Sequence, residues 1–450
     1  VEHCMQVKNI AIMGAGLVGS LLSMYLKKHG YQVTVYERRP DFRKTGNYGG
    51  RSINLAISER GWKGLQGVGL EQAVRDIAIP MPGRMVHDVQ GNLMFQPYGK
   101  PGEAINSVSR GGLNILMIDA AEEAGVTYKF NQRINEINPA GTAASMEDME
   151  TGTTYTLEPD LIIGADGAYS LVRYAMLKTD RFDYSQAYEN HGYKELTIPA
   201  GPNGTFLIDR DALHIWPRKQ FMLIALPNID GSFTCTLFFA LEGRESFEAI
   251  KTHADLDAFF DTYFPDVKPL MPTLHEDFFG NPTGLLMIVK CFPWSHGNTM
   301  LIGDAAHAII PFYGQGMNCG FEDCTVLNDL IEEFNHDWSK IIPAYQVARK
   351  PNSDAIADLA KLNFIEMRDL VADADFQFKK RIAAKVAAAY PDKFIPVYSM
   401  VSFSHLPYAD ALREYYRQDE VLSEVLTWPG VREHWDTELL PDIAQRLFNL

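Results

Sequence analysis

The chain has 450 residues, and 46% of them are hydrophobic, as is normal for a globular protein with a sizeable core. This length corresponds to about three average domains, or equally well to one large domain and a smaller one. The net charge of −16, from 41 Lys and Arg against 57 Asp and Glu, argues against nucleic acid as the main partner and against a surface attracted to anionic lipid.

The sequence shows no targeting or membrane segment. It begins Val1-Glu2-His3-Cys4-Met5 without a basic stretch followed by an apolar one, so no secretory signal is expected. No apolar run approaches the ~18 residues that indicate a membrane span. The five cysteines are odd in number and include no Cys-x-x-Cys pair, which indicates reduced thiols and neither a disulfide framework nor a zinc site. We therefore expect a cytoplasmic protein.

The first elements of the chain predict a strand–helix–strand unit. Val7–Met13 is an apolar run, Leu17–His29 has helical spacing and Gln32–Tyr36 is typical of a strand. Another helix is expected over Arg110–Ala124, among short strands within residues 103–178. This alternation is typical of an α/β layer.

The middle of the chain has a different pattern. Residues 182–290 alternate β-rich runs, such as Leu213–Trp216, Phe221–Leu226 and Phe233–Phe239. This spacing predicts a largely antiparallel sheet.

The last third of the chain returns to the first layer and then becomes helical. An apolar strand at residues 299–304 precedes a long loop and a helix from about Gln315. From about Ile341 onward the pattern is helical, broken by three prolines between residues 391 and 407.

Together these elements predict an α/β fold with three parts. A Rossmann-like nucleotide-binding layer is interrupted by an antiparallel-sheet domain, and a helical C-terminal part closes the chain. The predicted boundaries are residues 1–75, 100–181 and 291–340 for the nucleotide-binding layer, 76–99 and 182–290 for the sheet domain, and 341–450 for the helical region.

A glycine-rich turn joins the first strand to the first helix. Gly14-Ala15-Gly16-Leu17-Val18-Gly19 fits G-x-G-x-x-G, whose glycines permit a tight turn, close approach of a pyrophosphate, and close packing of helix on strand. The free N–H groups at the helix N-terminus favour a phosphate. Glu37 ends the next strand, where a carboxylate can accept from ribose hydroxyls. The alternative is a glycine-rich turn without a ligand, and the motif alone does not separate NAD from FAD.

Two later strands end in paired Asp and Gly residues. The segment 160–167 ends in Asp166-Gly167, and the segment 299–307 contains Gly303-Asp304. Each alone is compatible with an ordinary turn. In this order and spacing, however, the three segments resemble the single-component aromatic hydroxylases that use FAD, the p-hydroxybenzoate hydroxylase class. The resemblance implies that Asp304 contacts the flavin ribityl chain, and that Asp166 lies near both the flavin and the pyridine nucleotide.

The segment after Asp304 predicts a loop that feeds a helix. Pro311-Phe312-Tyr313-Gly314-Gln315-Gly316-Met317-Asn318 would point backbone N–H groups and a positive helix end at the flavin ring, stabilising negative charge there. A loop needed only for helix packing is the alternative. Arg110 lies where the class places an arginine that meets the cofactor, although a solvated arginine at a helix start is also compatible with the sequence.

Further stretches narrow the resemblance to the kynurenine 3-monooxygenase family. The likeness extends over nearly the whole chain. The stretches that carry it are Gly50–Gly61, Gly83–Met85, Gln96–Gly99, His191–Leu196 and Phe394–Phe403.

Four residues match the carboxylate-binding group of that family. They are Arg84, Tyr98, Asn363 and Tyr398. Arg offers a carboxylate two parallel charge-assisted donors, and the tyrosines and the amide add hydrogen bonds. Taken alone, each residue also has an ordinary explanation, as an ion-pair partner, an amphipathic core residue or a helix-surface residue.

The resemblance also implies residues around the substrate ring and the cofactor. Phe312 would flank the ring, and Glu366 and Met367 would share a helix face with Asn363. No role is assigned to Tyr313, because its position varies across the family. The implied cofactor-binding residues are Gly14, Gly16, Leu17, Val18, Gly19, Glu37, Arg38, Arg39, Ala56, Arg110, Ile134, Asp166, Asp304, Met317 and Asn318.

The activity implied by the resemblance belongs to tryptophan degradation and pyridine nucleotide biosynthesis. NADPH would reduce FAD, O₂ would give a flavin C4a-hydroperoxide, and L-kynurenine would become 3-hydroxy-L-kynurenine. The aromatic amine already activates the ring carbon, so no strong protein base is required, which agrees with the absence of a Ser/His/Asp or paired-carboxylate signature. There is no second glycine-rich βαβ unit, so NADPH is expected to bind transiently at the surface. We expect no membrane anchor.

Three other functions are compatible with parts of the sequence. A hydroxylase of another aromatic acid would share the cofactor segments. A flavin halogenase would show Trp-x-Trp-x-Ile-Pro, but no two of the six tryptophans are two residues apart. A non-enzymatic flavin-binding module would need no carboxylate-binding group and would not consume NADPH.

Overall fold

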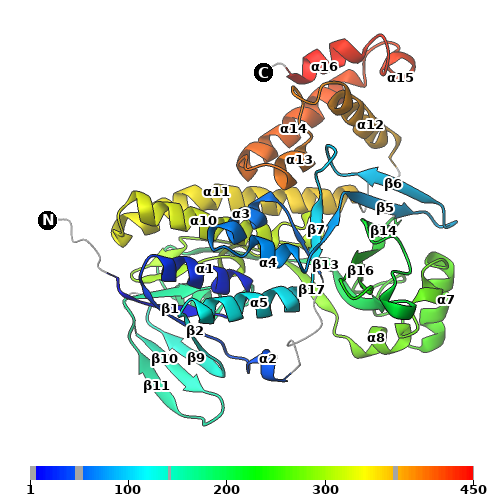
Figure 1. The fold of residues 1–450 in the computed structure, drawn as a ribbon. Helices are drawn as coiled ribbons and strands as arrows, with labels where there is room; N and C mark the ends of the chain where they lie inside the picture. Colours follow the sequence, from blue (N-terminus) through cyan, green and yellow to red (C-terminus); the bar gives the residue numbers. More distant parts are fainter. Residues whose placement is uncertain (1–6, 46–53, 140–142, 368–372, 449–450) are drawn as a thin grey trace.

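The computed structural model describes residues 7–45, 54–139, 143–367 and 373–448 of the chain. Residues 50–53 of the stretch Gly50–Gly61 lie outside this part. The predicted fold class is confirmed: a mixed α/β body carries a lobe of helices built from the C-terminal residues (Figure 1).

A six-stranded sheet forms the centre of the first layer. Its strand order is β18-β19-β12-β1-β2-β8, and all neighbours run parallel except β18 and β19. The strands are β1 (Asn9–Met13), β2 (Gln32–Tyr36), β8 (Thr127–Lys129), β12 (Leu161–Gly164), β18 (Ser295–His296) and β19 (Thr299–Leu301). The strand–helix–strand unit predicted for the N-terminal residues is confirmed, because α1 (Leu17–Lys28) joins β1 to β2.

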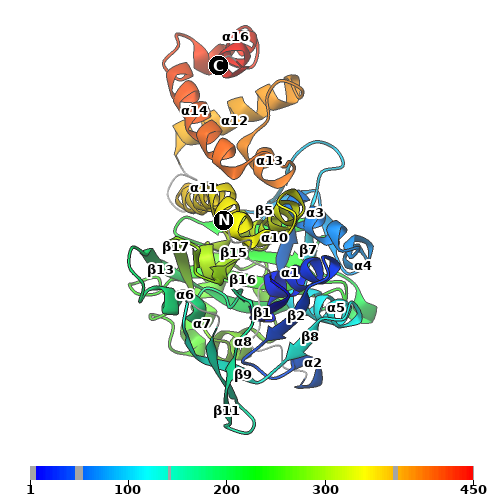
Figure 2. The ribbon, with the colours of Figure 1, turned by 90° about the vertical axis from the view of Figure 1, so that its left-hand side faces the viewer.

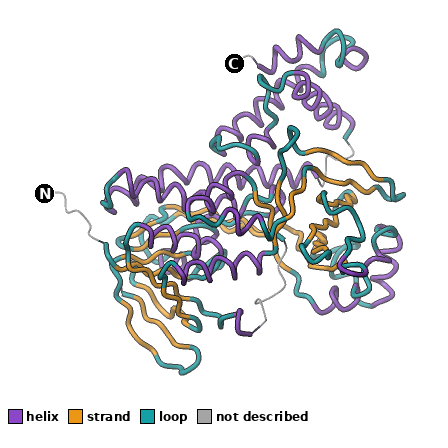
Figure 3. Tube along the Cα trace, viewed as in Figure 1, coloured by secondary structure: helices purple, strands orange, loops and turns teal. Residues whose placement is uncertain are grey.

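Helices and two small sheets surround this layer (Figure 3). The helices are α2 (Phe42–Thr45), α3 (Glu59–Gly67), α4 (Glu71–Arg75), α5 (Arg110–Glu123), α6 (Leu171–Met176), α9 (Asp304–His307) and α10 (Gly316–Glu333). The first small sheet consists of β3 (Leu55–Ile57), β7 (Ile105–Val108) and β4 (Ile79–Met81). The second consists of β9 (Gln132–Ile137), β10 (Ala144–Asp148) and β11 (Thr154–Leu157). Their buried apolar side chains share one core with the central sheet.

A seven-stranded sheet forms the second part. Its order is β17-β13-β16-β15-β14-β5-β6, and every pair is antiparallel except β14 with β5, so the predicted largely antiparallel sheet is confirmed. The strands are β5 (Gly83–His87), β6 (Leu93–Pro97), β13 (Asp183–Ile198), β14 (Ala212–Arg218), β15 (Phe221–Pro227), β16 (Phe233–Ala240) and β17 (Gly284–Phe292). One face of this sheet packs against α7 (His253–Tyr263) and α8 (Leu274–Gly280) through a core rich in phenylalanine.

The C-terminal residues are helical, as predicted. Helix α11 (Trp338–Ile365) begins slightly before the expected position and continues past Pro343 and Pro351. It packs against both α10 and α14. The predicted boundary at residue 341 falls inside this helix, close to its start. The remaining helices form the lobe above α11 (Figure 2). They are α12 (Ala374–Ala389), α13 (Val397–Ser402), α14 (Tyr408–Val425), α15 (Val431–His434) and α16 (Leu440–Phe448). None of the helices within the described residues has the length and apolar character needed to cross a membrane.

The phenylalanine core beneath the seven-stranded sheet gives a test of the fold. Phe260 of α7 is fully buried there, whereas Phe279 of α8 is 42% exposed. Removing a buried ring loses its apolar contacts and leaves a cavity, so Phe260→Ala should lower the free energy of unfolding by about 3–5 kcal/mol. Phe279→Ala should lower it by less than about 1 kcal/mol. Urea unfolding of both variants measures the difference, and equal losses would contradict this packing.

Candidate active site

A cavity of about 540 Å³ lies where the parallel layer meets the seven-stranded sheet. Its lining comes from the β1–α1 turn, the segments that follow β12 and β19, the loop before α10, and the cavity-facing side of the seven-stranded sheet. Arg84, Tyr98, Asn363 and Tyr398 line the same cavity. Residues far apart in the sequence, including both the cofactor segments and the predicted carboxylate-binding group, therefore meet in one space.

The glycines of the β1–α1 turn have different surroundings. A Cβ at Gly14 would lie 2.4 Å from the Ala165 carbonyl oxygen, and one at Gly19 would lie 2.1 Å from the Gly14 carbonyl oxygen. Gly16 differs, because a Cβ there would meet no atom within 4 Å, and it stands at the N-terminus of α1 without a side-chain cap. Two glycines thus close the turn, and the third leaves open space beside free N–H groups, as a bound pyrophosphate requires.

Asp304 lies at the start of α9 and lines the cavity. It follows Gly303, whose φ of +61° places the turn in the left-handed region that favours glycine. The side chain of Asp304 is exposed, and among the described residues no hydrogen bond to its carboxylate is found. A free carboxylate at this point fits the hydroxyl groups of a flavin ribityl chain.

Three of the predicted carboxylate-binding residues lie close together, because the charge of Arg84 acts on both Tyr98 and Tyr398. The rings of Tyr98 and Tyr398 stack with centroids 5.1 Å apart. Arg84 Nε donates to Gln96 Oε1 at 2.8 Å, and Asn363 Nδ2 donates to the Phe312 carbonyl oxygen at 2.7 Å.

The two stacked tyrosines remain hydrogen-bond donors. Burial raises the pKa of Tyr398 to about 12, although the nearby charge of Arg84 acts in the opposite direction. Burial, reinforced by the neighbouring Tyr398, likewise holds the pKa of Tyr98 well above its usual value. Both hydroxyl groups therefore keep their protons at neutral pH, beside one fixed positive charge.

Apolar and aromatic groups form the wall next to these residues. Phe312 packs on Phe364 and Phe238, with ring centroids 4.4 Å and 4.8 Å away. Met367 also lines the cavity. Tyr313, to which the sequence assigned no role, lies with its ring centroid 5.7 Å from that of Tyr398 and completes the aromatic wall.

Known proteins with similar sequences decide between the remaining possibilities. The FAD binding domain family matches residues 7–216 and 289–360, more than half of the chain. A kynurenine 3-monooxygenase from Flavobacterium johnsoniae is 50% identical over 442 residues, and the match covers 98% of each of the two chains. One from Myxococcus xanthus is 49% identical over 419 residues, which cover 92% of this chain and 90% of its own. The chain belongs to the kynurenine 3-monooxygenase family.

A solved structure supports the fold of this family member. The tetrameric form of 2-methyl-3-hydroxypyridine-5-carboxylic acid oxygenase is 21% identical and superposes with a TM-score of 0.66. The match covers 81% of this chain and 93% of the oxygenase. At this identity the likeness establishes a common fold.

Several residues that the family resemblance implied do not line the cavity. The Asp166 carboxylate accepts from Ser170 Oγ at 2.5 Å and from the Leu171 N–H at 2.7 Å, so it caps α6. Glu366 accepts from Tyr415 Oη at 2.8 Å and from Lys380 Nζ at 3.0 Å, and so faces the C-terminal helices. Their contacts with cofactor or substrate stay predictions.

Glu37 and Asn318 act behind the cavity wall. Glu37 accepts from the Ala15 N–H at 3.0 Å and from Arg39, and so fixes the glycine-rich turn. Asn318 donates to the carbonyl oxygens of Ala56 and Gly314, both at 2.9 Å.

The other residues of the implied cofactor set fall into two groups. The part of that set that lines the cavity comprises Gly16, Leu17, Val18, Ala56, Arg110, Asp304 and Met317. Arg38 is exposed beyond the end of β2, and Ile134 lies in β9, where it pairs with Met146. Neither of these two residues lines the cavity, and their contact with a cofactor stays a prediction.

A buried charge network lies directly behind Asp304. Asp323, with no exposed surface, accepts from the Gly303 N–H at 3.0 Å, from His307 Nε2 at 2.6 Å and from Arg349 Nε at 2.6 Å. Sequence reasoning quoted His307 but gave it no role. It missed Asp323 and Arg349, because each stands beside another charged residue and nothing local in the sequence marks it as buried. His307, Cys319 and Asp323 are close enough to ligate a metal, but the Arg349 guanidinium already occupies the carboxylate.

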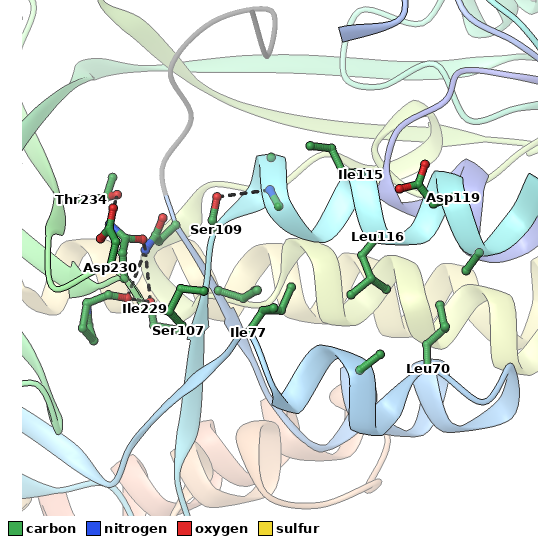
Figure 4. A pocket seen from close by; sticks show the side chains of 18 of the residues that line it. Leu70, Ile77, Ser107, Ser109, Ile115, Leu116, Asp119, Ile229, Asp230 and Thr234 are labelled. Carbon is green, nitrogen blue, oxygen red and sulfur yellow. Dashed lines mark hydrogen bonds between the residues drawn. The ribbon is translucent and has the colours of Figure 1, made fainter. Parts of the chain in front are cut away.

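A second cavity, of about 960 Å³, lies between α4, α5 and the turn that follows β15 (Figure 4). Apolar side chains of the two helices, such as Leu70 and Leu116, form one side, and polar groups such as Ser107 and Asp230 form the other. None of the three flavin segments lines it. This cavity adjoins the candidate active site, because Asn54 lines both.

The His307–Asp323 pair predicts how stability depends on pH. Burial opposes the charge of His307, but the Asp323 carboxylate outweighs it and holds the imidazole pKa well above its usual value. The ion pair therefore contributes fully below about pH 6.5, the unfolded pKa, and its contribution is lost as pH rises through the raised pKa. Urea unfolding between about pH 6 and pH 9 should show His307→Gln less stable than the unsubstituted protein, by a margin that narrows with rising pH.

His434 provides the matched control, because its side chain is 52% exposed. His434→Gln should follow the unsubstituted protein across the same range. A margin for His307→Gln that stays constant or widens as pH rises would contradict the charged state of the buried pair.

Proposed function

We propose that this chain is an FAD-dependent monooxygenase that uses NADPH and O₂ to convert L-kynurenine into 3-hydroxy-L-kynurenine, a step of tryptophan degradation. The observation that carries this proposal is one cavity that is lined both by the flavin segments and by Arg84, Tyr98, Asn363 and Tyr398. The chain is 50% identical, over 98% of its length, to a kynurenine 3-monooxygenase. This similarity supports the choice of substrate.

The residues of the parallel layer fit FAD. The open space at Gly16 and the N-terminus of α1 would hold the pyrophosphate, and the free Asp304 carboxylate would accept from the ribityl hydroxyls. When bound, FAD supplies the redox chemistry by taking electrons from NADPH and activating O₂. The loop Pro311–Tyr313 and the N-terminus of α10 line the cavity at the point where the flavin ring would lie, and the positive helix end would stabilise negative charge on it.

The amino-acid part of kynurenine fits the carboxylate-binding part of the cavity. Its α-carboxylate needs charge-assisted donors, which Arg84 supplies in a planar pair, while the protonated Tyr98 and Tyr398 add hydroxyl donors. Asn363 lies beside Phe312 and would complete the group. This part of the cavity fixes the substrate by its carboxylate and leaves the ring to the apolar wall.

The apolar wall then places the ring and keeps water away from it. Phe312, Phe238 and Met367 line this part of the cavity. The aromatic amine of kynurenine already directs electrons to the neighbouring ring carbon, so the protein need only orient the ring and exclude water. A phenolic acid would instead call for a group that removes the phenol proton.

The compartment proposed is the cytoplasm, and the support comes from the cysteines. Cys235, Cys291, Cys319 and Cys324 are all unpaired and buried, which fits a reducing compartment.

The direct test of the proposed activity is NADPH oxidation by the FAD-loaded protein with and without L-kynurenine. We expect kynurenine to accelerate NADPH oxidation and to gain one oxygen atom, detected by mass. If kynurenine neither speeds NADPH oxidation nor is hydroxylated, the proposed function is wrong. A phenolic acid as alternative substrate distinguishes another hydroxylase, and no NADPH oxidation with either compound would indicate a non-enzymatic module.

Arg84 gives a second test, directed at the carboxylate-binding residues. Arg84→Ala removes the fixed charge, which is worth about 2 kcal/mol or more and corresponds to a rise of roughly 30-fold in KM for kynurenine. The FAD content should not change, because Arg84 lies away from the cofactor segments. Arg210→Ala is the matched control, since the Arg210 side chain is 52% exposed, pairs with its neighbour Asp211 and lies over the Phe206 ring. Loss of FAD from Arg84→Ala would contradict this prediction, because it would show that Arg84 acts at the cofactor site.

A further inference from the structure

A buried chain of hydrogen bonds lies behind Arg84, on the opposite face of the seven-stranded sheet. His87 Nδ1 lies 3.0 Å from Asp266 Oδ2, and His87 Nε2 lies 2.8 Å from His214 Nδ1. His214 Nε2 in turn lies 2.7 Å from the carbonyl oxygen of Asp209. His87 and His214 are only 4% and 2% exposed, so water cannot supply alternative partners.

The donors and acceptors of this chain fix the position of its protons. The Asp209 carbonyl can only accept, so His214 Nε2 must donate to it. Burial lowers the pKa of His214 to about 4, so its ring is neutral and Nδ1 must accept. His87 Nε2 is therefore the partner that donates to His214, and the other ring nitrogen of His87 meets the Asp266 carboxylate, so the His87 ring bridges the two.

Further charged groups surround His87. Burial alone would raise the pKa of Asp266, but its bonds to His87 and to Trp216 Nε1 outweigh burial and lower it, so the carboxylate is ionised. Arg218, Asp88 and Asp209 are also nearby, and the Arg218 guanidinium donates to the backbone carbonyls of His87 and Asp88. The indole of Trp216 stacks on the His87 ring, with centroids 4.0 Å apart.

The position of His87 in the sheet connects this chain to the cavity. Arg84 and His87 both lie on β5, where side chains alternate between the two faces. Arg84 pairs with Leu213, and both line the cavity; Met85 pairs with His214, on the face that carries the buried chain. Only four residue pairs join β5 to β14. A slip of one residue would move Arg84 to the opposite face of the sheet.

We propose that His87, through its hydrogen bonds to Asp266 and His214, is a positioning residue, which holds β5 in register on β14 and thereby keeps Arg84 at the carboxylate-binding part of the cavity. This inference rests on the proposed function of Arg84 as the carboxylate ligand. His87 itself does not line the cavity. Its removal should affect the binding of kynurenine while the cofactor site stays intact.

The sharpest variant is Asp266→Asn, because it keeps the shape of the side chain and replaces the carboxylate that holds His87. We expect KM for kynurenine to rise about tenfold, with kcat and FAD content unchanged.

Asp277→Asn is the matched control. Asp277 is a buried aspartate of the same part of the protein, and it accepts from Thr273 Oγ1 at 2.9 Å in α8. This variant should lose stability but keep the KM of the unsubstituted enzyme. An Asp266→Asn variant that is only less stable, with the same KM as the unsubstituted enzyme, would overturn the positioning role.

A spectroscopic measurement on the unsubstituted holoenzyme reads the hydrogen bonds of His87 directly. Histidine labelled with ¹⁵N should show both ring nitrogens of His87 engaged in hydrogen bonds, with His87→Gln used to assign the signal. A His87 ring without these two hydrogen bonds would overturn the proposal whatever the kinetics show. If the unsubstituted enzyme did not hydroxylate kynurenine, the proposed function would fail first, and the role given to Arg84 would fail with it. Normal hydroxylation with an unshifted KM in Asp266→Asn would overturn the positioning role alone.

Discussion

The buried carboxylate of Asp323 is the interaction on which the active-site cavity depends. It binds the Gly303 N–H, His307 and Arg349, which belong to the cofactor turn, α9 and α11. Arg349 also binds Glu322, which binds Arg60, and Arg60 donates to the carbonyl oxygens of Val401 and Ser404 just beyond Tyr398. One network therefore sets the cofactor turn and α13, the helix that carries Tyr398, relative to each other.

Such a network holds its geometry because the loss of one partner would leave a buried charge unpaired and lower the free energy of unfolding. A buried ion loses its hydration, and the loss is offset only when every charge and proton has a well-placed partner. Arg60, almost fully buried, gains further contact by lying over the Tyr408 ring, 3.9 Å from its centroid. Tyr408 in turn donates to Gln315 at 2.8 Å, next to the N-terminus of α10. The C-terminal helices are thus fixed to the cofactor layer by polar contacts as well as by apolar packing.

Sequence reasoning succeeded where the signal is local. The strand over β2 and the helix over α1 follow from hydrophobic spacing, and the glycine-rich turn follows from backbone geometry. The partners of buried charges could not be predicted in this way, because His87 and Asp266 are 179 residues apart in the chain. The hydrogen bonds of Glu366 could not be predicted for the same reason, since its partners Tyr415 and Lys380 belong to helices expected only as a helical region. The cavity-lining residues Arg84 and Tyr398 were found only through the family resemblance.

The central claim is that one cavity holds the flavin at the parallel layer and the kynurenine carboxylate at Arg84. A crystal structure of the FAD-loaded enzyme with L-kynurenine tests it most directly. The account predicts the substrate carboxylate within about 2.7–3.2 Å of the Arg84 guanidinium and of the Tyr98 and Tyr398 hydroxyls, with the ring against Phe312 and the flavin. A kynurenine whose carboxylate binds elsewhere, or whose ring lies away from the flavin, would contradict it.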